Sequence, residues 1–251
     1  MHTNETNPPV PVLAPRVPAV PWGWHDLFWA IVLAASGIVV LNLGVVALSA
    51  MIGSQLRENG IVLALFVIAQ DALVFGAAWL FSVARYRVNW NTLGLRAFAV
   101  PMGCGLSVGL LMASYAIRFC YVVTLMGLGI NPQMQAVIPR LDTSGIGLLI
   151  TFVAVAIFAP VVEEVFFRGF LYGGMRGRIG MVGALVGSAL FFTALHFTLD
   201  QFIPIFILGL FLAWLYEKTG SLYPGICLHI ANNALALIAL MIIRATGLVP
   251  I

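Results

Sequence analysis

Two adjacent glutamates and an arginine stand inside an otherwise apolar stretch of the chain. Glu163, Glu164 and Arg168 follow sequence that is apolar from about Ile146 onward. An ionised side chain in hydrocarbon costs about 2.5 to 3.5 kcal/mol on insertion scales, so neighbouring charges at this depth need partners or water. A carboxylate that meets water there can act in general acid–base chemistry. We therefore interpret this stretch as a functional site, with a structural polar clamp as the alternative.

Helical spacing separates the two glutamates. Glu164 and Arg168 are four residues apart, so they share a helix face and can form an ion pair. Glu163 is rotated by about 100° from Glu164 in a helix of 3.6 residues per turn. It therefore points to a different face, and the two carboxylates are expected to have different roles.

Two histidines lie deep in other apolar stretches. The 33 residues from Glu163 to His196 are centred on a glycine-rich turn at 173–180. If the chain forms an antiparallel hairpin there, this carboxylate and imidazole lie at similar height and can hold a water molecule. His229 and Asn233 are four residues apart and offer two hydrogen-bond donors on one face, which suits an oxyanion. Each histidine alone would also be compatible with a packing role.

Other polar residues in apolar stretches have structural interpretations. Pro160, one turn before Glu163, is expected to kink its helix. Asp71 and Arg118 carry opposite charges on different stretches and are expected to form a structural interhelical pair. Asn232 is expected to make a helix-packing hydrogen bond.

The composition indicates that these polar residues lie in a membrane protein. The chain is 62% hydrophobic and 8% charged, whereas soluble domains carry about 25% charged residues. This indicates a polytopic membrane protein in contact with lipids. The net charge of +3 includes no basic run, so nucleic acid is not an expected partner. The three cysteines, Cys104, Cys120 and Cys227, have no metal-binding spacing and are expected to be packing residues.

The predicted fold class is all-α, a transmembrane helix bundle of about seven spans. About 20 apolar residues cross a bilayer, and the candidate stretches are 27–52, 61–84, 97–128, 146–172, 182–197, 202–216 and 222–243. We expect a single transmembrane domain at 22–251. Residues 1–21 hold six of the 13 prolines and are expected to form a disordered tail. Trp22 and Trp24 fit an interfacial aromatic belt.

The distribution of basic residues predicts the orientation of this bundle. Three basic residues fall on one side, Arg57, Arg140 and Arg244. Seven fall on the side of the amino terminus, namely Arg16, Arg85, Arg87, Arg96, Arg176, Arg178 and Lys218. Cytoplasmic loops carry the excess of Lys and Arg, so the amino terminus is expected to be cytoplasmic. In a bacterium the membrane would be the inner, plasma membrane.

Three motifs follow one another on the last apolar stretches. They are Glu163-Glu164-x-x-x-Arg168, Phe192-x-x-x-His196 and His229-x-x-x-Asn233. In this order they resemble the CPBP family of CAAX proteases and bacteriocin-processing enzymes, also called the Abi family, which includes the Ras-converting CAAX endoprotease. The resemblance covers about residues 146–240 and implies that the catalytic core lies there.

This resemblance implies a function and a role for each motif. Glu163 and His196 would activate the attacking water, Glu164 and Arg168 would support the site, and His229 with Asn233 would stabilise the tetrahedral oxyanion. The implied activity is an intramembrane endopeptidase acting on a peptide or a membrane-anchored protein. The zinc pattern His-Glu-x-x-His is absent and Arg168 would repel a cation, so no cofactor is expected. A divalent metal such as zinc, held by Glu163, His196 and His229, remains the alternative.

A second hypothesis comes from a different class of protein. A non-catalytic membrane scaffold or bacteriocin-immunity factor would use the same polar cluster to bind a partner. Such a scaffold should tolerate Glu163→Gln, whereas a glutamate-dependent enzyme should not. The substrate and the oligomeric state stay open at this point.

Overall fold

The computed structural model describes residues 17–130, 142, 145–196 and 200–246, without the side chains of Ser54 and Arg57. Within this part every regular element is helical, so the predicted all-α class is confirmed. The elements are α1 (Trp24–Ile52), η1 (Ser54–Arg57), α2 (Gly60–Trp79), η2 (Leu80–Ala84), η3 (Trp90–Leu93), α3 (Val100–Gly127), α4 (Gly145–Thr151), η5 (Phe152–Phe158), α5 (Ala159–Glu163), η6 (Glu164–Tyr172), α6 (Gly173–Ala194), α7 (Phe202–Thr219) and α8 (Tyr223–Thr246). Residues 1–16 of the predicted tail lie outside the described residues.

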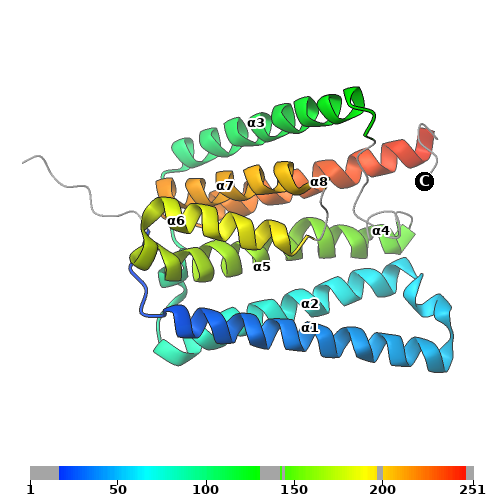
Figure 1. Cartoon of the computed structure of the whole chain (residues 1–251), viewed down its shortest axis with the longest axis horizontal. Helices are drawn as coiled ribbons and strands as arrows, with labels where there is room; N and C mark the ends of the chain where they lie inside the picture. The colour runs from blue at the N-terminus through cyan, green and yellow to red at the C-terminus, as the bar shows by residue number, and fades with distance from the viewer. Residues whose placement is uncertain (1–16, 131–141, 143–144, 197–199, 247–251) are drawn as a thin grey trace, which may run out of the picture.

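Six helical runs in the described part are long and apolar enough to cross a membrane. One of them, Gly145–Ala194, contains the predicted fourth and fifth spans. Gly180 interrupts this run with φ 73° and ψ 178°, a left-handed conformation that glycine adopts without steric cost. The chain reverses its direction around this point (Figure 1). The predicted hairpin is therefore confirmed, and six runs accommodate about seven passages through the bilayer.

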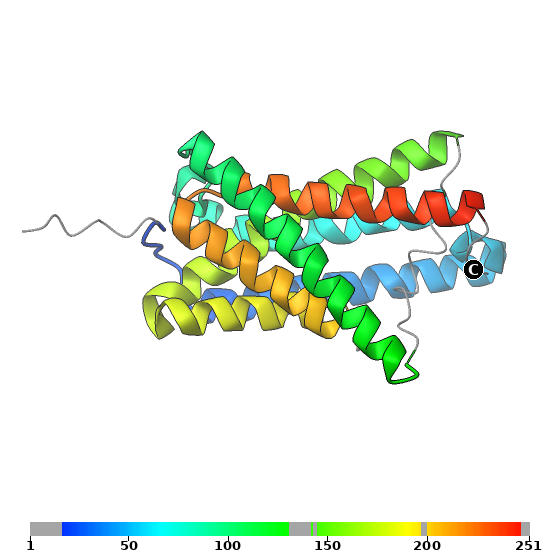
Figure 2. The same ribbon diagram turned by 90° about the horizontal axis from the view of Figure 1, so that it is seen from above.

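The run from α4 to η6 lies at the centre of the bundle. α2 packs against α5, η5 and η6, while α6 packs along η6 and α8 packs along η5 and α5. α1 pairs with α2 on the outside (Figure 1), and α3 crosses over α7 and α8 (Figure 2). All nine residues of η6, which carries Glu164 and Arg168, are buried. The sequence that carries the charges is thus the best-shielded part of the fold.

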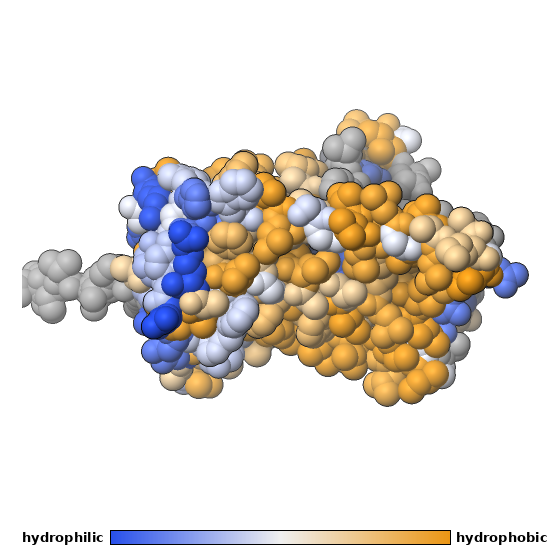
Figure 3. Space-filling model, turned by 90° about the horizontal axis from the view of Figure 1, so that it is seen from below, coloured by the Kyte–Doolittle hydropathy of each residue, from blue (hydrophilic) through white to orange (hydrophobic). Residues whose placement is uncertain are grey.

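The outer surface is suited to a bilayer. Exposed side chains along α1 and α3 include Val40 at 69%, Leu43 at 63%, Met112 at 69% and Phe119 at 70% exposure. One end of the molecule is hydrophilic, whereas most of the remaining surface in the same view is apolar (Figure 3). Together with the six long apolar runs, this surface describes a multi-pass integral membrane protein.

Ion pairs tie the helix ends together near the amino-terminal end of α1. Arg85 Nε lies 3.2 Å from Asp26 Oδ1, which joins the end of η2 to the first turn of α1. Arg176 binds both carboxylate oxygens of Glu217, at 2.9 and 2.8 Å, and joins α6 to the end of α7. Arg96 Nε donates to a carbonyl in the turn between α7 and α8 at 2.7 Å. Several basic residues predicted to share one side of the membrane thus lie at one end of the bundle.

Pro160 has a wider effect than the predicted kink. Proline removes a backbone donor and crowds the preceding turn, and the helix here has π-helical stretches, η5 and η6, on both sides of α5. Side chains from other segments bind carbonyls of these stretches. Asn233 Nδ2 donates to Val155 O at 3.0 Å and Ser188 Oγ donates to Phe167 O at 2.9 Å. Polar backbone groups in a membrane need such internal partners.

Trp22 provides a third contact of this kind. Its Nε1 donates to Phe170 O at 2.9 Å, and its ring stacks on that of Phe170 with centroids 5.8 Å apart. Trp22 is completely buried, so its predicted place in an interfacial aromatic belt is wrong, while Trp24 is 51% exposed. Val17 is also buried, at 5% exposure, and the packed part of the described chain therefore begins before α1.

Candidate active site

Glu164 and Arg168 form a completely buried ion pair within η6. Arg168 Nη1 lies 2.7 Å from Glu164 Oε1, and the two side chains are 0% and 1% exposed. Arg168 Nη2 donates to Gly209 O of α7 at 3.2 Å, and the guanidinium lies 4.5 Å from the ring centroid of Phe192. The intrahelical pair predicted from the spacing is therefore present, and it anchors η6 to α6 and α7.

His229 brings the two adjacent glutamates together. Its Nδ1 lies 3.0 Å from Glu164 Oε1, and its Nε2 lies 3.5 Å from Glu163 Oε2. The imidazole is 3% exposed, so it is held between the two carboxylates away from solvent. A carboxylate on one ring nitrogen fixes the orientation of the imidazole. The sequence predicted His229 as an oxyanion donor but not this bridging position.

The two glutamates have different surroundings, as the helical spacing predicted. The side chain of Glu163 is 22% exposed, compared with 1% for Glu164. Glu163 also has no arginine partner among the ion pairs of the described residues. It is therefore the carboxylate that can contact water.

A glycine on α8 allows this helix to approach Glu164. Gly225 stands four residues before His229, and a Cβ built at this position would lie 3.2 Å from Glu164 Oε2. That oxygen is buried and has no hydrogen-bond partner in the described part of the chain. The missing side chain at Gly225 thus makes room for the carboxylate. The spacing Gly-x-x-x-His was a signal in the sequence for this contact.

His196 adjoins this network through Phe192. Its Nδ1 lies 2.8 Å from Phe192 O, which is an acceptor, so Nδ1 carries the proton and Nε2 is the basic nitrogen of the neutral ring. The Phe192 ring centroid is 4.6 Å from that of His196 and 5.7 Å from that of His229. One aromatic ring thus contacts both imidazoles and the Arg168 guanidinium.

Asn233 is held by two neighbours. Its Nδ2 donates to Val155 O at 3.0 Å, and its Oδ1 accepts a hydrogen bond from Asn232 Nδ2 at 3.1 Å. These contacts orient the amide and use one of its two N–H groups. Asn232 was predicted to make a packing hydrogen bond, and its partner is the neighbouring site residue.

The predicted pair of Asp71 and Arg118 is not formed. No ion pair joins them within the described residues, and Arg118 instead lies 5.9 Å from the ring centroid of Tyr115. The reason is helix packing, since α2 lies against α5 whereas α3 lies against α7 and α8. Asp71 therefore lies on a helix that packs against α5 and η6 rather than against α3.

The alternative metal site would need its three side chains to converge on one point. In the described part of the chain, no group of three or more His, Cys, Asp or Glu side chains is arranged to hold a metal ion. Glu163, His196 and His229 do not form such a set, and we derive no step through a metal.

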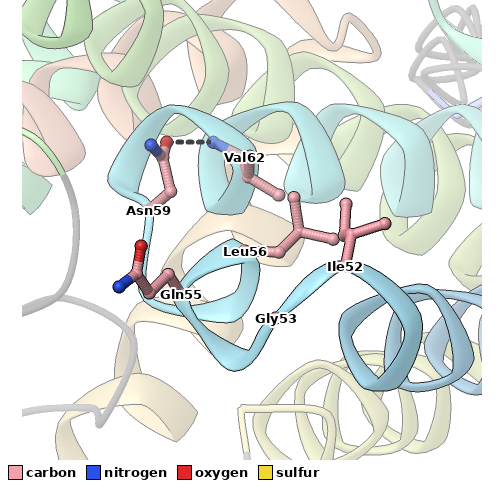
Figure 4. A pocket seen from close by; sticks show the side chains of 6 residues that line it. All are labelled: Ile52, Gly53, Gln55, Leu56, Asn59 and Val62. Atoms are coloured by element: carbon pink, nitrogen blue, oxygen red, sulfur yellow. Dashed lines mark hydrogen bonds between the residues drawn. The ribbon is translucent and has the colours of Figure 1, made fainter.

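Two surface hollows lie outside the site. One is formed by the α1–α2 connection and is lined by Ile52, Gly53, Gln55, Leu56, Asn59 and Val62 (Figure 4). Asn59 Oδ1 accepts from the backbone N–H groups of Ile61 and Val62 there and caps α2. The other is lined by Arg96, Ala97, Phe98, Ala99, Met102 and Thr219. Neither contains a residue of the three motifs.

A comparison with protein-family models matches one segment of the chain. Residues 145–235 match the family model described as type II CAAX prenyl endopeptidase Rce1-like. The match covers this segment of the chain, so the likeness to that family is a likeness of the segment. No curated protein and no solved structure matches the chain. The matched segment begins with α4, ends within α8, and contains every residue of the three motifs.

Proposed function

We propose that this protein is an intramembrane endopeptidase that hydrolyses a peptide bond of a membrane-associated substrate with a water molecule activated by Glu163. The observation that carries the proposal is the difference between the two glutamates. Glu164 is buried against Arg168, whereas Glu163 is 22% exposed beside His229. A general base has to reach both the water and the substrate, and only Glu163 of this pair meets that condition.

In this mechanism Glu163 accepts a proton from the attacking water, and Nε2 of His196, which lies just after the end of α6, holds that water. The oxygen of the water then bonds to the scissile carbonyl carbon, and the carbonyl oxygen becomes an oxyanion. The second N–H of Asn233 and Nε2–H of a protonated His229 are the donors for that oxyanion. Collapse of the intermediate breaks the C–N bond, and the proton on Glu163 passes to the leaving amine.

This assignment of roles is supported by a series of contacts in which each residue holds the next one in place. Arg168 fixes Glu164, Glu164 fixes the His229 ring, and Asn232 fixes the amide of Asn233. Groups that are held in place before the substrate binds need no reorganisation during the reaction, which is how such donors lower a barrier. We infer that the catalytic core coincides with the matched segment 145–235.

The substrate that we propose is a membrane-anchored peptide or protein with a carboxyl-terminal CAAX sequence, as the family description indicates. A prenyl group would enter the bilayer beside the apolar helices and bring the adjacent peptide to the site. We also propose that the basic end of the bundle faces the cytoplasm, following the positive-inside rule.

The test uses purified protein in lipid vesicles and two peptides, a prenylated peptide that ends in a CAAX sequence and its unprenylated form. We expect two products whose masses sum to the substrate plus one water. Glu163→Ala and His196→Ala should abolish cleavage without lowering the thermal unfolding midpoint. Full activity of either variant would refute the assignment of these residues. Activity that is lost on chelation and restored by zinc would favour the metal alternative.

The scaffold hypothesis makes a different prediction in cells. If the polar cluster only binds a partner, Glu163→Gln should complement a deletion strain as well as the wild-type protein does, because the amide preserves size and hydrogen bonding. If the cluster hydrolyses peptides, the same variant should fail to complement at equal membrane abundance. Neither result depends on knowing the substrate.

A further inference from the structure

α3 carries one charged side chain, Arg118, well inside the span. Nine residues follow it before the helix ends at Gly127, which places Arg118 about 13 Å from that end. The side chain is half-buried, and in the described part of the chain it belongs to none of the ion pairs. A charge at this depth is costly without a counter-charge, so an intramembrane arginine is a candidate functional residue.

Two contacts connect Arg118 to the candidate active site. Its guanidinium carbon lies 5.9 Å from the ring centroid of Tyr115, which is one turn closer to the amino-terminal end of α3. Tyr115 OH donates to Asn232 O of α8 at 3.1 Å, and Asn232 Nδ2 donates to Asn233 Oδ1 at 3.1 Å. Arg118 thus contacts the residue that joins α3 to α8, whereas a snorkelling arginine would extend toward the nearer end of its helix.

These contacts limit the distance from Arg118 to the oxyanion donor. Taken end to end through the phenol ring, they place the guanidinium carbon within about 12 Å of Asn232 O. A CAAX sequence has four residues, so no more than three separate its terminal carboxylate from a bond that is cut within it. Three extended residues span about 10 to 11 Å. A substrate whose scissile carbonyl lies at Asn233 can therefore reach Arg118 with its carboxyl terminus.

The packing of α3 leaves Arg118 at the edge of the contact between α3 and α8. α3 is joined to α8 at Tyr115, and it diverges from α8 toward its own carboxyl-terminal end (Figure 2). Side chains that follow Arg118 on α3 are exposed, including Phe119 at 70% and Val123 at 52%. A peptide that lies within the bilayer can therefore approach this part of α3.

The same contact contains a buried acceptor without a partner. Oδ1 of Asn232 has no hydrogen-bond partner in the described part of the chain, and Asn232 is 6% exposed. An extended peptide carries backbone N–H donors and ends in a carboxylate, so it complements both this acceptor and the cation of Arg118. Arg168 does not suit the carboxylate, because it is completely buried and bonded to Glu164.

We propose that Arg118 is a substrate-binding residue whose guanidinium binds the terminal carboxylate of the peptide while Asn233 binds the oxyanion. This inference rests on the proposed function, because it places the carboxyl end of that substrate at that site. A guanidinium presents parallel N–H donors that match a carboxylate, and their attraction is stronger in a low-dielectric environment than in water. The site then favours substrates that end close to the cleaved bond, because a longer extension carries the carboxylate past Arg118.

The test compares a prenylated peptide that ends in a CAAX sequence with the same peptide amidated at its carboxyl terminus. The wild-type kcat/KM should be higher for the free carboxylate by about 10- to 100-fold, the effect of one charge-assisted hydrogen bond. Arg118→Gln should lower kcat/KM for the carboxylate peptide by a similar factor and leave that for the amidated peptide within about threefold of wild type. Arg118→Lys should retain part of the preference.

Arg87→Gln is the matched control, because it removes an exposed cation outside the spans and should keep the whole preference for the carboxylate. An equal loss on both peptides in Arg118→Gln would indicate a structural role and overturn the proposal. An unchanged preference in that variant would overturn it as well.

Binding of the same two peptides separates this inference from the proposed function. Fluorescently labelled peptides are titrated onto Glu163→Gln in lipid vesicles, with and without the second substitution Arg118→Gln. The carboxylate peptide should bind about tenfold more tightly than the amidated one only when Arg118 is present. If this holds and the wild-type protein cleaves neither peptide, the proposed function fails while the carboxylate site stands. If peptide is cleaved but both peptides bind equally to both variants, the carboxylate site fails while the hydrolytic function stands.

Discussion

Nδ1 of His229 lies 3.0 Å from Oε1 of Glu164, the same oxygen that accepts a hydrogen bond from Arg168. This contact joins α8 to η6 across 65 residues of sequence. It also means that the charge of Glu164 is already used by two internal partners. The more exposed Glu163 is left for chemistry, and the imidazole between the two glutamates has a defined orientation.

Removing Arg168 should destabilise the protein strongly. Arg168→Met leaves Glu164 buried without its cation, and the loss of one member of a buried pair costs about 3 to 5 kcal/mol. We expect a large decrease in the thermal unfolding midpoint in detergent. The double variant Glu164→Gln/Arg168→Met should recover much of the stability, because no unpaired charge remains, but it should stay inactive because His229 has lost its carboxylate partner. Equal stability of the single and double variants would contradict the pairing.

Asn233 should affect the rate more than substrate affinity. Removal of one oxyanion donor lowers kcat by about 10² to 10³, so Asn233→Ala should show this loss with little change in KM. Asn232→Ala removes the contact that orients the amide and should cost about tenfold, the worth of one hydrogen bond of about 1.4 kcal/mol. Asn42→Ala on the exposed side of α1 is the control and should leave kcat and KM unchanged. A change confined to KM would exclude the oxyanion role.

Two glycines should respond in opposite ways to alanine. Gly225→Ala places a methyl group 3.2 Å from Glu164 Oε2 and should displace the carboxylate, lowering both activity and thermal stability. Gly109→Ala in α3 meets no atom within 4 Å and should stabilise that helix by about 0.5 to 1 kcal/mol. Peptide cleavage and thermal unfolding measured on both variants test the close packing of α8 against η6. If Gly225→Ala cleaves peptide and unfolds as Gly109→Ala does, the close packing of α8 against η6 is contradicted.

The hydrogen bond from Tyr86 to Asp26 should make stability depend on alkaline pH. Tyr86, which follows the second span, donates from its OH to Asp26 Oδ2 in the first turn of α1 at 2.7 Å, and this bond raises the pKa of Tyr86 above its usual value. The folded protein thus holds the phenol proton more tightly than the unfolded chain, for which the pKa is about 10. The stabilisation is complete below that pH and is lost as the pH rises through the folded pKa. Tyr86→Phe should reduce this alkaline decrease in the unfolding midpoint, and an identical pH dependence would refute the coupling.

The sequence was sufficient for features that depend on local periodicity. Apolar length predicted the spans, the four-residue spacing predicted the contact of Glu164 with Arg168, and the glycine-rich turn predicted the reversal at Gly180. Each of these features follows from one helix or from two helices joined by a short turn. The motifs also indicated the family that the matched segment supports.

Features that depend on how distant helices rotate and pack could not be predicted from local spacing. His229 shares a face with Asn233 in any helix, but its contact with both glutamates depends on the rotation of α8 against η6. Asp71 was paired with Arg118 by opposite charge alone, although their helices pack against different neighbours. The burial of Trp22 follows from a π-helical carbonyl that a period of 3.6 residues does not anticipate.

The most direct test of the proposed mechanism is the single-turnover rate of Glu163→Gln on a substrate that the wild-type protein cleaves. The amide keeps the shape of the side chain but cannot accept a proton from water, and general base catalysis contributes about 10² to 10⁴ in rate. We predict a decrease of at least 10², with an unchanged unfolding midpoint and with Glu58→Gln, in the α1–α2 connection, as an active control. A Glu163→Gln rate within a few-fold of the wild-type rate would contradict the role of Glu163 as the base.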